Sequence, residues 1–233
     1  MQMHPEDNRS EPRPVEPAPP KSSGSEPIFK IPFVPLVVAV GLVGLFMAQS
    51  SLGQGGMEMG LRPVDLSAGY VGGLFTHMLV HGSWAHVIMN AVALLAFGTP
   101  VARDFDKGMG PIGWLLFFIV CGVLGGLGYA LVHWGSYTPM VGASGAVFGM
   151  IGASLRLMAG PGLLIPLFHP VVLRGAAAWM AVNLVTGLLG SLLTGGEAGI
   201  AWEAHAFGFL AGIILIAPFH QFFSRKIHRM PGS

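Results

Sequence analysis

The chain alternates long apolar segments with short polar or glycine- and proline-rich connections. The longer segments reach the ~20 apolar residues that a helix needs to cross a bilayer. Six segments predict membrane-spanning helices, at about residues 31–50, 84–101, 111–134, 144–160, 171–193 and 200–223. The pattern therefore predicts an all-α membrane protein whose six-helix domain covers residues 31–223.

The two ends of the chain differ from this domain in composition. Residues 1–30 are rich in proline, glutamate and serine and contain almost no large apolar side chains. Such a segment cannot bury enough surface to offset the entropy of ordering, so we expect a disordered N-terminal tail. It does not resemble a cleaved signal peptide, because the first apolar segment starts late and follows acidic residues. Residues 224–233 form a short basic tail.

Overall composition agrees with a membrane protein. The chain is 52% hydrophobic and 10% charged, with a mean hydropathy of +0.65, whereas soluble domains carry about 25% charged residues. The net charge of +1 gives no indication of a nucleic-acid partner. The only cysteine, Cys121, lies inside an apolar segment, so it forms no internal disulfide and gives no metal signal.

The distribution of basic residues predicts the orientation in the membrane. Basic residues of the tails, connections and segment ends fall on one predicted face, and the other face has essentially only Arg62. Those on the first face are Lys30, Arg103, Lys107, Arg156, Arg174, Arg225, Lys226 and Arg229. Basic residues concentrate on the cytoplasmic side, so both termini are predicted to be cytoplasmic, in a membrane that we expect to be the bacterial inner membrane.

Four polar residues lie near the external ends of the second, fourth and sixth segments: His86 and Asn90, Ser144, and His205. All three segments enter the membrane from the external face, so their first two turns share a depth of about 3 to 10 Å. Polar side chains at such depths are costly and indicate a functional site.

Ser144 and His205 can form a nucleophile and its base, because a serine hydroxyl needs a neighbouring imidazole to take its proton. We expect no carboxylate in the last segment to orient His205, so the pair would be a dyad. Phe148, one helical turn after Ser144, could pack against the imidazole and orient it instead.

His86 and Asn90 are four residues apart, so both project from one face of their helix. Together with the backbone amide of Ser144 at a helix N-terminus, they could stabilise an oxyanion. The glycines beside Ser144, Gly142 and Gly145, allow a substrate backbone to come close.

Simpler interpretations of these residues remain open. The glycine spacings Gly145 to Gly149 and Gly208 to Gly212 are also typical of helix packing in membranes. A buried His205 can be a hydrogen-bonded structural residue. His77, His81 and His86 could be metal ligands, but no carboxylate accompanies them. We therefore predict neither a metal nor another cofactor.

Taken together, the motifs resemble those of the rhomboid family of intramembrane serine proteases, over about residues 36–223. Gly142-Ala143-Ser144-Gly145 resembles the family's nucleophile motif, and Ala204-His205 with Gly208 and Gly212 resembles its base motif. His81, His86 and Asn90, preceded by Thr76-His77, resemble its second-helix motif.

The resemblance implies an intramembrane serine endopeptidase that cleaves transmembrane or membrane-proximal segments of other proteins. It implies a Ser144–His205 dyad, oxyanion donors at His86, Asn90 and Ser144, and a structural His81. It also implies that substrates enter beside the fifth segment, with residues 194–200 as a mobile cap.

Two positions depart from the family's pattern. Gly72-Gly73 stand where relatives often have Trp-Arg, so we expect a looser first connection. Phe148 stands where some relatives have tyrosine, which keeps the ring and loses a hydroxyl.

Two other functions predict different features in the sequence. A non-catalytic relative that binds client transmembrane helices typically lacks the serine or the histidine, and both are present here. A small transporter or channel predicts charges within the membrane or inverted repeats, and the segments show neither clearly. The sequence does not indicate an oligomeric state.

Overall fold

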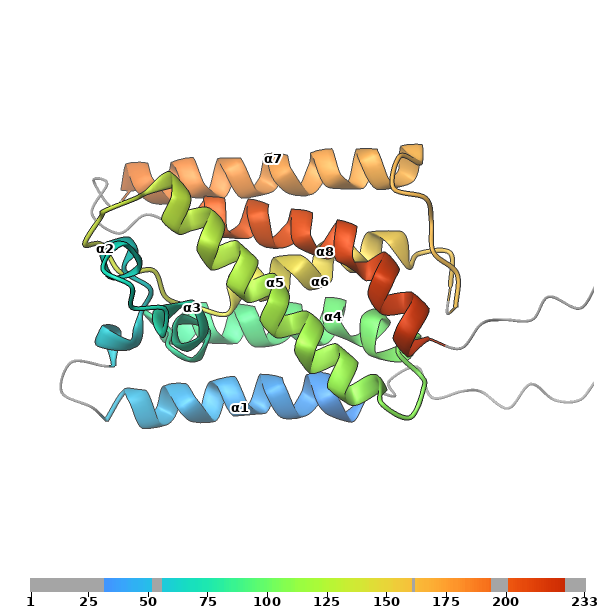
Figure 1. Ribbon diagram of the computed structural model, residues 1–233, viewed down its shortest axis with the longest axis horizontal. Coiled ribbons are helices and arrows are strands. Elements are labelled where there is room, and N and C mark those ends of the chain that lie inside the picture. The colour runs from blue at the N-terminus through green and yellow to red at the C-terminus, as the bar shows by residue number, and fades with distance from the viewer. Residues whose placement is uncertain (1–31, 52–55, 161, 194–200, 225–233) are drawn as a thin grey trace, which may run out of the picture. The chain divides into compact units, whose positions relative to one another are not determined.

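The computed structural model describes residues 32–51, 56–160, 162–193 and 201–224 (Figure 1). The predicted disordered tail, the predicted mobile cap at 194–200 and the basic residues after 224 lie outside these ranges. Within them the regular structure is helical, apart from one isolated antiparallel bridge between Leu61 and Met140.

Each predicted apolar segment contains one helix. These helices are α1 (Phe33–Gln49), α4 (Trp84–Asp104), α5 (Gly110–Val132), α6 (Ser144–Arg156), α7 (Pro170–Leu193) and α8 (Trp202–Phe223). Among the described residues, α4, α5, α7 and α8 are long and apolar enough to cross a membrane. With 17 and 13 residues, α1 and α6 are shorter.

The short helix α6 lies at the centre of the bundle. It packs against α4, α5, α7 and α8 (Figure 1), and most of its residues are buried. In contrast, α1 packs mainly on α4, and α7 mainly on α6 and α8. Many α7 side chains are exposed, so this helix is held by fewer contacts than its neighbours.

The crossing of α6 and α8 depends on two pairs of glycines. A Cβ atom on Gly208 would overlap the backbone carbonyl of Gly145, and one on Gly212 would overlap that of Gly149. Close backbone approach through small residues is a common way to pack helices in membranes. The packing interpretation of the spacing from Gly208 to Gly212 is therefore confirmed, and the same crossing brings the start of α6 beside the start of α8.

The connection between α1 and α4 is partly helical. Its described part, 56–83, forms the short helices η1 (Met57–Met59), α2 (Pro63–Ser67), α3 (Gly73–Thr76) and η2 (His77–Leu79). Leu61 and Leu74 are buried, and the Thr76 hydroxyl donates to the Met59 carbonyl at 2.6 Å. Buried leucines and local hydrogen bonds thus support the described part of this connection, and the expectation of a looser connection stays a prediction.

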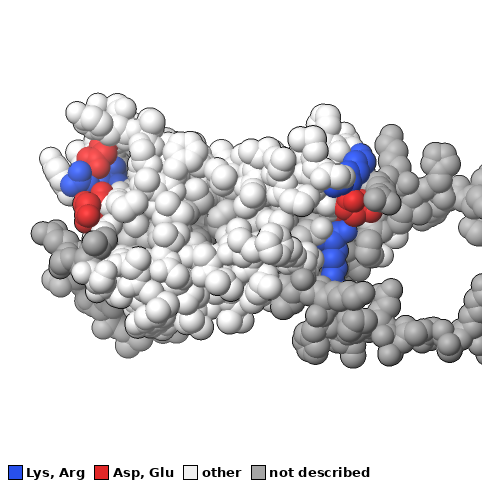
Figure 2. Space-filling view, turned by 90° about the horizontal axis from the view of Figure 1, so that it is seen from below, with Lys and Arg blue, Asp and Glu red and all other residues white. Residues whose placement is uncertain are grey.

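Charged side chains gather at the two ends of the described bundle, with a broad uncharged band between them (Figure 2). The end where α4 and α8 finish holds Lys107, whose amine donates to the Phe222 carbonyl at 3.1 Å, and Arg156, which donates to the Ile213 carbonyl at 2.8 Å. We call this the basic end. Arg62 lies in the α1–α4 connection, paired with Asp65 at 2.8 Å. An apolar band between charged ends is expected of a protein that sits in a bilayer.

Candidate active site

Ser144 is the first residue of α6, and its side chain contacts a histidine of α8. The distance from Ser144 Oγ to His205 Nε2 is 2.7 Å, within hydrogen-bonding range, although 61 residues separate the two in the sequence. His205 lies in the first turn of α8 and is buried. The structure therefore brings together the predicted nucleophile and the predicted base.

An aromatic ring fixes one face of the His205 imidazole. Phe148 stacks on it with a centroid distance of 4.3 Å and an interplanar angle of 4°. Phe148 is in turn met edge-on by Trp179 of α7, at a centroid distance of 6.2 Å. The predicted packing of Phe148 against the base is present in the structure.

The edge of the His205 ring that points away from Ser144 meets a residue to which the sequence assigned no role. His205 Nδ1 lies 2.9 Å from Oδ1 of Asn183, a buried residue of α7. In the sequence, Asn183 stands out as a polar residue in an otherwise apolar segment. The number of residues between Asn183 and His205 does not indicate whether the two lie at the same depth, because a connection separates their helices.

The prediction that no carboxylate lies in the last segment is wrong, because Glu203 is in the first turn of α8. Its carboxylate nevertheless does not serve His205. It lies 3.1 Å from His133 Nε2 at the end of α5. Successive helical positions point in different directions, so a residue two places before His205 faces another helix.

The second-helix residues meet the turn that precedes Ser144. Gly142 has a φ of +116°, and a Cβ atom there would lie 2.6 Å from His86 Nε2 and 3.8 Å from Asn90 Nδ2. Glycine is thus required both for the backbone conformation and for the space that the His86 ring occupies. The structure places His86 and Asn90 beside the turn that leads into Ser144.

Asn90 is buried, and among the described residues its Nδ2 has no hydrogen-bond partner. A buried donor without a partner costs free energy and calls for an explanation. His86 begins the same helix face one turn earlier, where its backbone amide donates to the N-cap hydroxyl of Ser83 at 3.2 Å. Both side chains thus lie beside Gly142, and within the described structure Asn90 Nδ2 is a buried donor that is free to bond.

Two histidines of the α1–α4 connection hold the turn itself. Gly142 N donates to the His77 carbonyl at 2.8 Å, and the His77 Nδ1 donates to the Gly142 carbonyl at 3.2 Å. His81 Nε2 accepts from the Ala143 amide at 3.4 Å. The backbone of His81 is paired in both directions with the side chain of Gln49, at 2.7 and 3.0 Å. His81 thus has the supporting contacts that the resemblance implies, while His77 and Gln49 were not predicted as part of the site.

Burial keeps both of these histidines neutral. It lowers the pKa of His77 to about 4, against the opposing effect of the Gly142 carbonyl. It also lowers the pKa of His81 to about 4, with a further contribution from His86 and His77. His81 must be neutral to accept from Ala143, because an imidazolium has no acceptor nitrogen.

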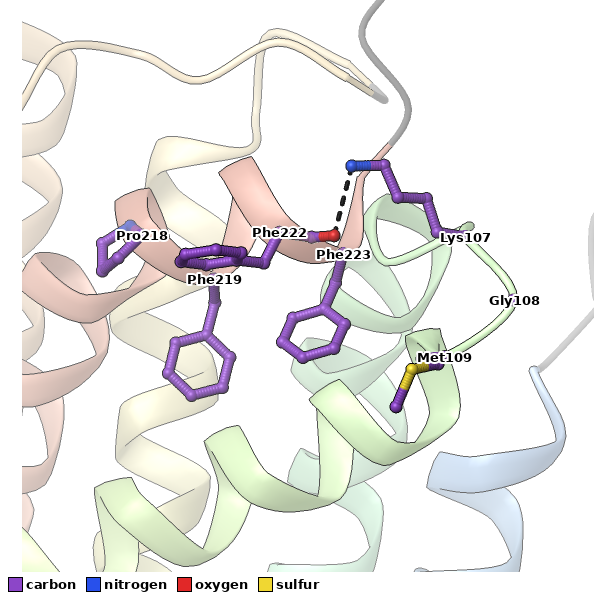
Figure 3. A pocket seen from close by; sticks show the side chains of 7 residues that line it. All are labelled: Lys107, Gly108, Met109, Pro218, Phe219, Phe222 and Phe223. Atoms are coloured by element: carbon purple, nitrogen blue, oxygen red, sulfur yellow. Dashed lines mark hydrogen bonds between the residues drawn. The ribbon is translucent and has the colours of Figure 1, made fainter.

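Other parts of the described structure offer less chemistry. Among the residues with described positions, no group of three or more His, Cys, Asp or Glu side chains is arranged to hold a metal ion. A cavity of about 670 Å³ lies at the basic end, lined by Lys107, Gly108, Met109, Pro218, Phe219, Phe222 and Phe223 (Figure 3). It has no paired nucleophile and base, and its one amine is engaged with backbone carbonyls.

Comparison with known proteins agrees with this geometry. The family model described as "Rhomboid domain" matches residues 68–222, which include all four helices that carry the site. The chain belongs to the rhomboid family. Rhomboid proteins are generally intramembrane serine proteases.

Several curated relatives share the rhomboid region. The chain is 26% identical to "Rhomboid protease AarA" of Providencia stuartii over 153 residues, which are 59% of this chain and 52% of that protein. It is 35% identical to "Rhomboid protease GluP" of Bacillus subtilis over 82 residues, 35% of this chain and 15% of that protein. It is 30% identical to "Uncharacterized protein Rv1337" of Mycobacterium tuberculosis over 162 residues, 66% of this chain and 61% of that protein.

The chain covers less than two thirds of the length of the curated relatives that it matches.

Proposed function

We propose that this rhomboid protein is an intramembrane serine endopeptidase. The observation that carries the proposal is the 2.7 Å contact between Ser144 Oγ and His205 Nε2, with the imidazole stacked on Phe148. A serine and an imidazole in hydrogen-bond contact, with the imidazole oriented by a third group, are the signature of an activated nucleophile.

In the proposed reaction, Ser144 Oγ attacks the scissile carbonyl carbon while its proton passes to His205 Nε2. His205 then donates that proton to the leaving amine, which leaves an acyl-enzyme ester on Ser144. Water attacks the ester with His205 again as the base, and the serine hydroxyl is restored.

The tetrahedral intermediates carry negative charge on the former carbonyl oxygen. We assign its stabilisation to His86, to Asn90 and to the backbone amide of Ser144, which has no partner within α6 because it is at the helix N-terminus. The unpartnered Asn90 Nδ2 supports this assignment. Loss of one such donor typically lowers kcat about 10²–10³-fold.

The length of α6 supports a site inside the membrane. Its 13 residues span only about 20 Å, against a hydrocarbon thickness of ~30 Å. With Arg156 at the basic interface, Ser144 would lie roughly 10 Å below the opposite surface. We propose that α1 and α6 complete a six-span bundle, with both termini in the cytoplasm of a bacterial cell.

The proposed substrates are transmembrane or membrane-proximal segments of other proteins. A regular helix engages its carbonyls in hydrogen bonds, so small or helix-weakening residues are expected near the cut. Because α7 packs mainly on α6 and α8, we propose entry beside α7.

The test is cleavage of a membrane-anchored substrate by the purified protein in lipid vesicles, combined with labelling by a fluorophosphonate. Ser144→Ala and His205→Ala are expected to abolish cleavage, and Ser144→Ala to abolish labelling. Ser154→Ala is the matched control, because Ser154 lies on the same helix and its hydroxyl donates to the Ile151 carbonyl at 2.8 Å.

Cleavage by Ser144→Ala at the wild-type rate would contradict the proposal. The alternative of a non-catalytic relative has its own signature. It requires client binding that survives Ser144→Ala, with no cleavage by the wild type.

A further inference from the structure

Asn183 occupies a position that the proposed dyad does not explain. It lies on α7, and its side chain is 1% exposed in a helix whose other described side chains are mostly apolar and often exposed. Burying an amide costs free energy unless both of its ends are hydrogen-bonded. Both ends of the Asn183 amide are hydrogen-bonded, and both partners belong to the first turn of α8.

The orientation of the amide follows from its first partner. Asn183 Nδ2 donates to the Trp202 carbonyl at 2.8 Å. A carbonyl oxygen can only accept, so the NH₂ group must face it, and a flipped amide would set two oxygens against each other. The Oδ1 atom is thereby left facing His205 Nδ1, at 2.9 Å.

The second contact fixes the protonation of the base. Asn183 Oδ1 has only lone pairs, so His205 Nδ1 must carry the hydrogen that it shares. The neutral imidazole then has its lone pair on Nε2, the atom 2.7 Å from Ser144 Oγ. In the other tautomer Nδ1 and Oδ1 would present lone pairs to each other, and Nε2 could not take the serine proton.

Building on the proposed protease function, we propose that Asn183 is a positioning residue that selects the reactive tautomer of His205. The chain of contacts runs from the Trp202 carbonyl through the Asn183 amide and the imidazole to the Ser144 hydroxyl. As His205 takes the serine proton it becomes an imidazolium, and the Nδ1–H bond to Asn183 becomes charge-assisted and stronger. Phe148 fixes the ring plane, and Asn183 fixes which edge of the ring carries the hydrogen.

This arrangement also ties the base to a second helix. Asn183 belongs to α7, whereas His205 and Trp202 belong to α8. Since α7 packs mainly on α6 and α8, a shift of α7 away from α8 would remove the acceptor from His205 Nδ1. His205 is therefore held in its reactive tautomer only while α7 packs against α8 and Asn183 contacts His205 Nδ1.

Three variants separate this role from a structural one. Asn183→Leu has similar volume and removes both hydrogen bonds. Asn183→Asp keeps an oxygen opposite His205 Nδ1 but lacks the amide donor to Trp202. Thr186→Val is the matched control, since Thr186 lies on the same helix and its hydroxyl donates to α7 carbonyls, those of Val182 and Asn183, at 2.9 and 3.0 Å.

The measurements are kcat and KM for a membrane-anchored substrate, thermal stability, and the ¹⁵N NMR spectrum of histidine-labelled protein, which distinguishes the tautomers. We expect Asn183→Leu to lower kcat about 10- to 100-fold with KM unchanged, as for other groups that orient a reacting residue. The wild-type His205 signal should be that of the Nδ1–H tautomer, and the leucine variant should show a mixture. Asn183→Asp should keep more activity than Asn183→Leu, and Thr186→Val should behave as the wild type.

Wild-type kcat in Asn183→Leu, or an Nε2–H tautomer in the wild type, would overturn the inference. Equal losses in Asn183→Asp and Asn183→Leu would also overturn it, because they would place the effect in the bond to Trp202. If Asn183→Leu does not fold, the aspartate variant and the wild-type NMR spectrum still decide. Failure of the protease proposal is recognised separately, by a wild type that does not cleave, and the tautomer measurement does not depend on cleavage.

Discussion

At the scale of single residues, the turn before Ser144 depends on groups that take no part in the proposed chemistry. Gly142 and Ala143 are held by His77 and His81, whose rings act as neutral hydrogen-bonding groups. Protonation of His81 would remove its acceptor nitrogen and release the Ala143 amide. The geometry ahead of Ser144 is thus linked to pH through residues that lie outside the spans.

Stability should therefore decrease as the pH falls from 6.5 to 4. In this window the unfolded state, with a histidine pKa near 6.5, binds more protons than the folded state, in which the pKa of His77 and His81 is about 4. The contribution of each histidine is fully present above pH 6.5 and amounts to at most about 3 kcal/mol. The measurement is the free energy of unfolding in detergent between pH 7 and pH 4.

The double variant His77→Gln, His81→Gln should be less stable at pH 7 and should show a flatter pH dependence. The same slope in the variant as in the wild type would mean that other groups cause the effect.

At the scale of helices, the crossing of α6 and α8 sets the distance between Ser144 Oγ and His205 Nε2. At that crossing the two backbones approach through Gly145, Gly149, Gly208 and Gly212. Side chains larger than hydrogen at Gly208 and Gly212 would overlap the carbonyls of Gly145 and Gly149 and separate the helices. Ser144 lies on α6 and His205 on α8. Their 2.7 Å contact therefore depends on how closely the two helices approach.

Gly212→Ala should therefore reduce both stability and activity, although Gly212 is two turns away from His205. Its methyl group would overlap the Gly149 carbonyl, and overpacking of this kind costs about 1–3 kcal/mol. The matched control is Gly41→Ala on α1, where a Cβ atom meets nothing within 4 Å. That variant should be as stable as the wild type or slightly more so, because alanine favours helix.

Thermal denaturation in detergent and the cleavage assay measure both variants. An undiminished melting temperature in Gly212→Ala would show that the two helices can separate without cost.

At the scale of the whole molecule, the uncharged band between two charged ends (Figure 2) defines how the described domain meets a bilayer. We propose that the basic end faces the cytoplasm, as expected from the concentration of lysine and arginine on that side. The start of α6, and with it Ser144, then lies toward the external face.

Cysteine labelling can test this orientation, because the only native cysteine, Cys121, is buried and can be replaced by alanine. In that background, Ser67→Cys and Gly108→Cys provide exposed thiols in the α1–α4 connection and at the basic end. A membrane-impermeant maleimide should label the first in intact bacterial cells and the second only after permeabilisation. The reverse pattern would contradict the orientation.

The sequence alone determined the helical class, the position of each long helix and the residues now found at the site. Apolar segments of sufficient length allow only helices in a bilayer, because each backbone group must be bonded within its own segment. Ser144, His205, His86 and Asn90 were identifiable because polar side chains stand out in apolar segments. The ends of the segments were predicted within a few residues, as for α4, which continues to Asp104.

The tertiary structure decided how these residues are connected. Asn183, His77 and Gln49 were polar residues without an assigned role, and Glu203 was overlooked. Only the packing of α7 on α8 shows that Asn183 meets His205, and only the side-chain direction shows that Glu203 meets His133. Helical periodicity specifies the face of a residue on its own helix, but the rotation and depth of two helices relative to each other follow from packing between them. We propose that this packing also leaves Nε2 of His205 as the atom that accepts the proton of Ser144.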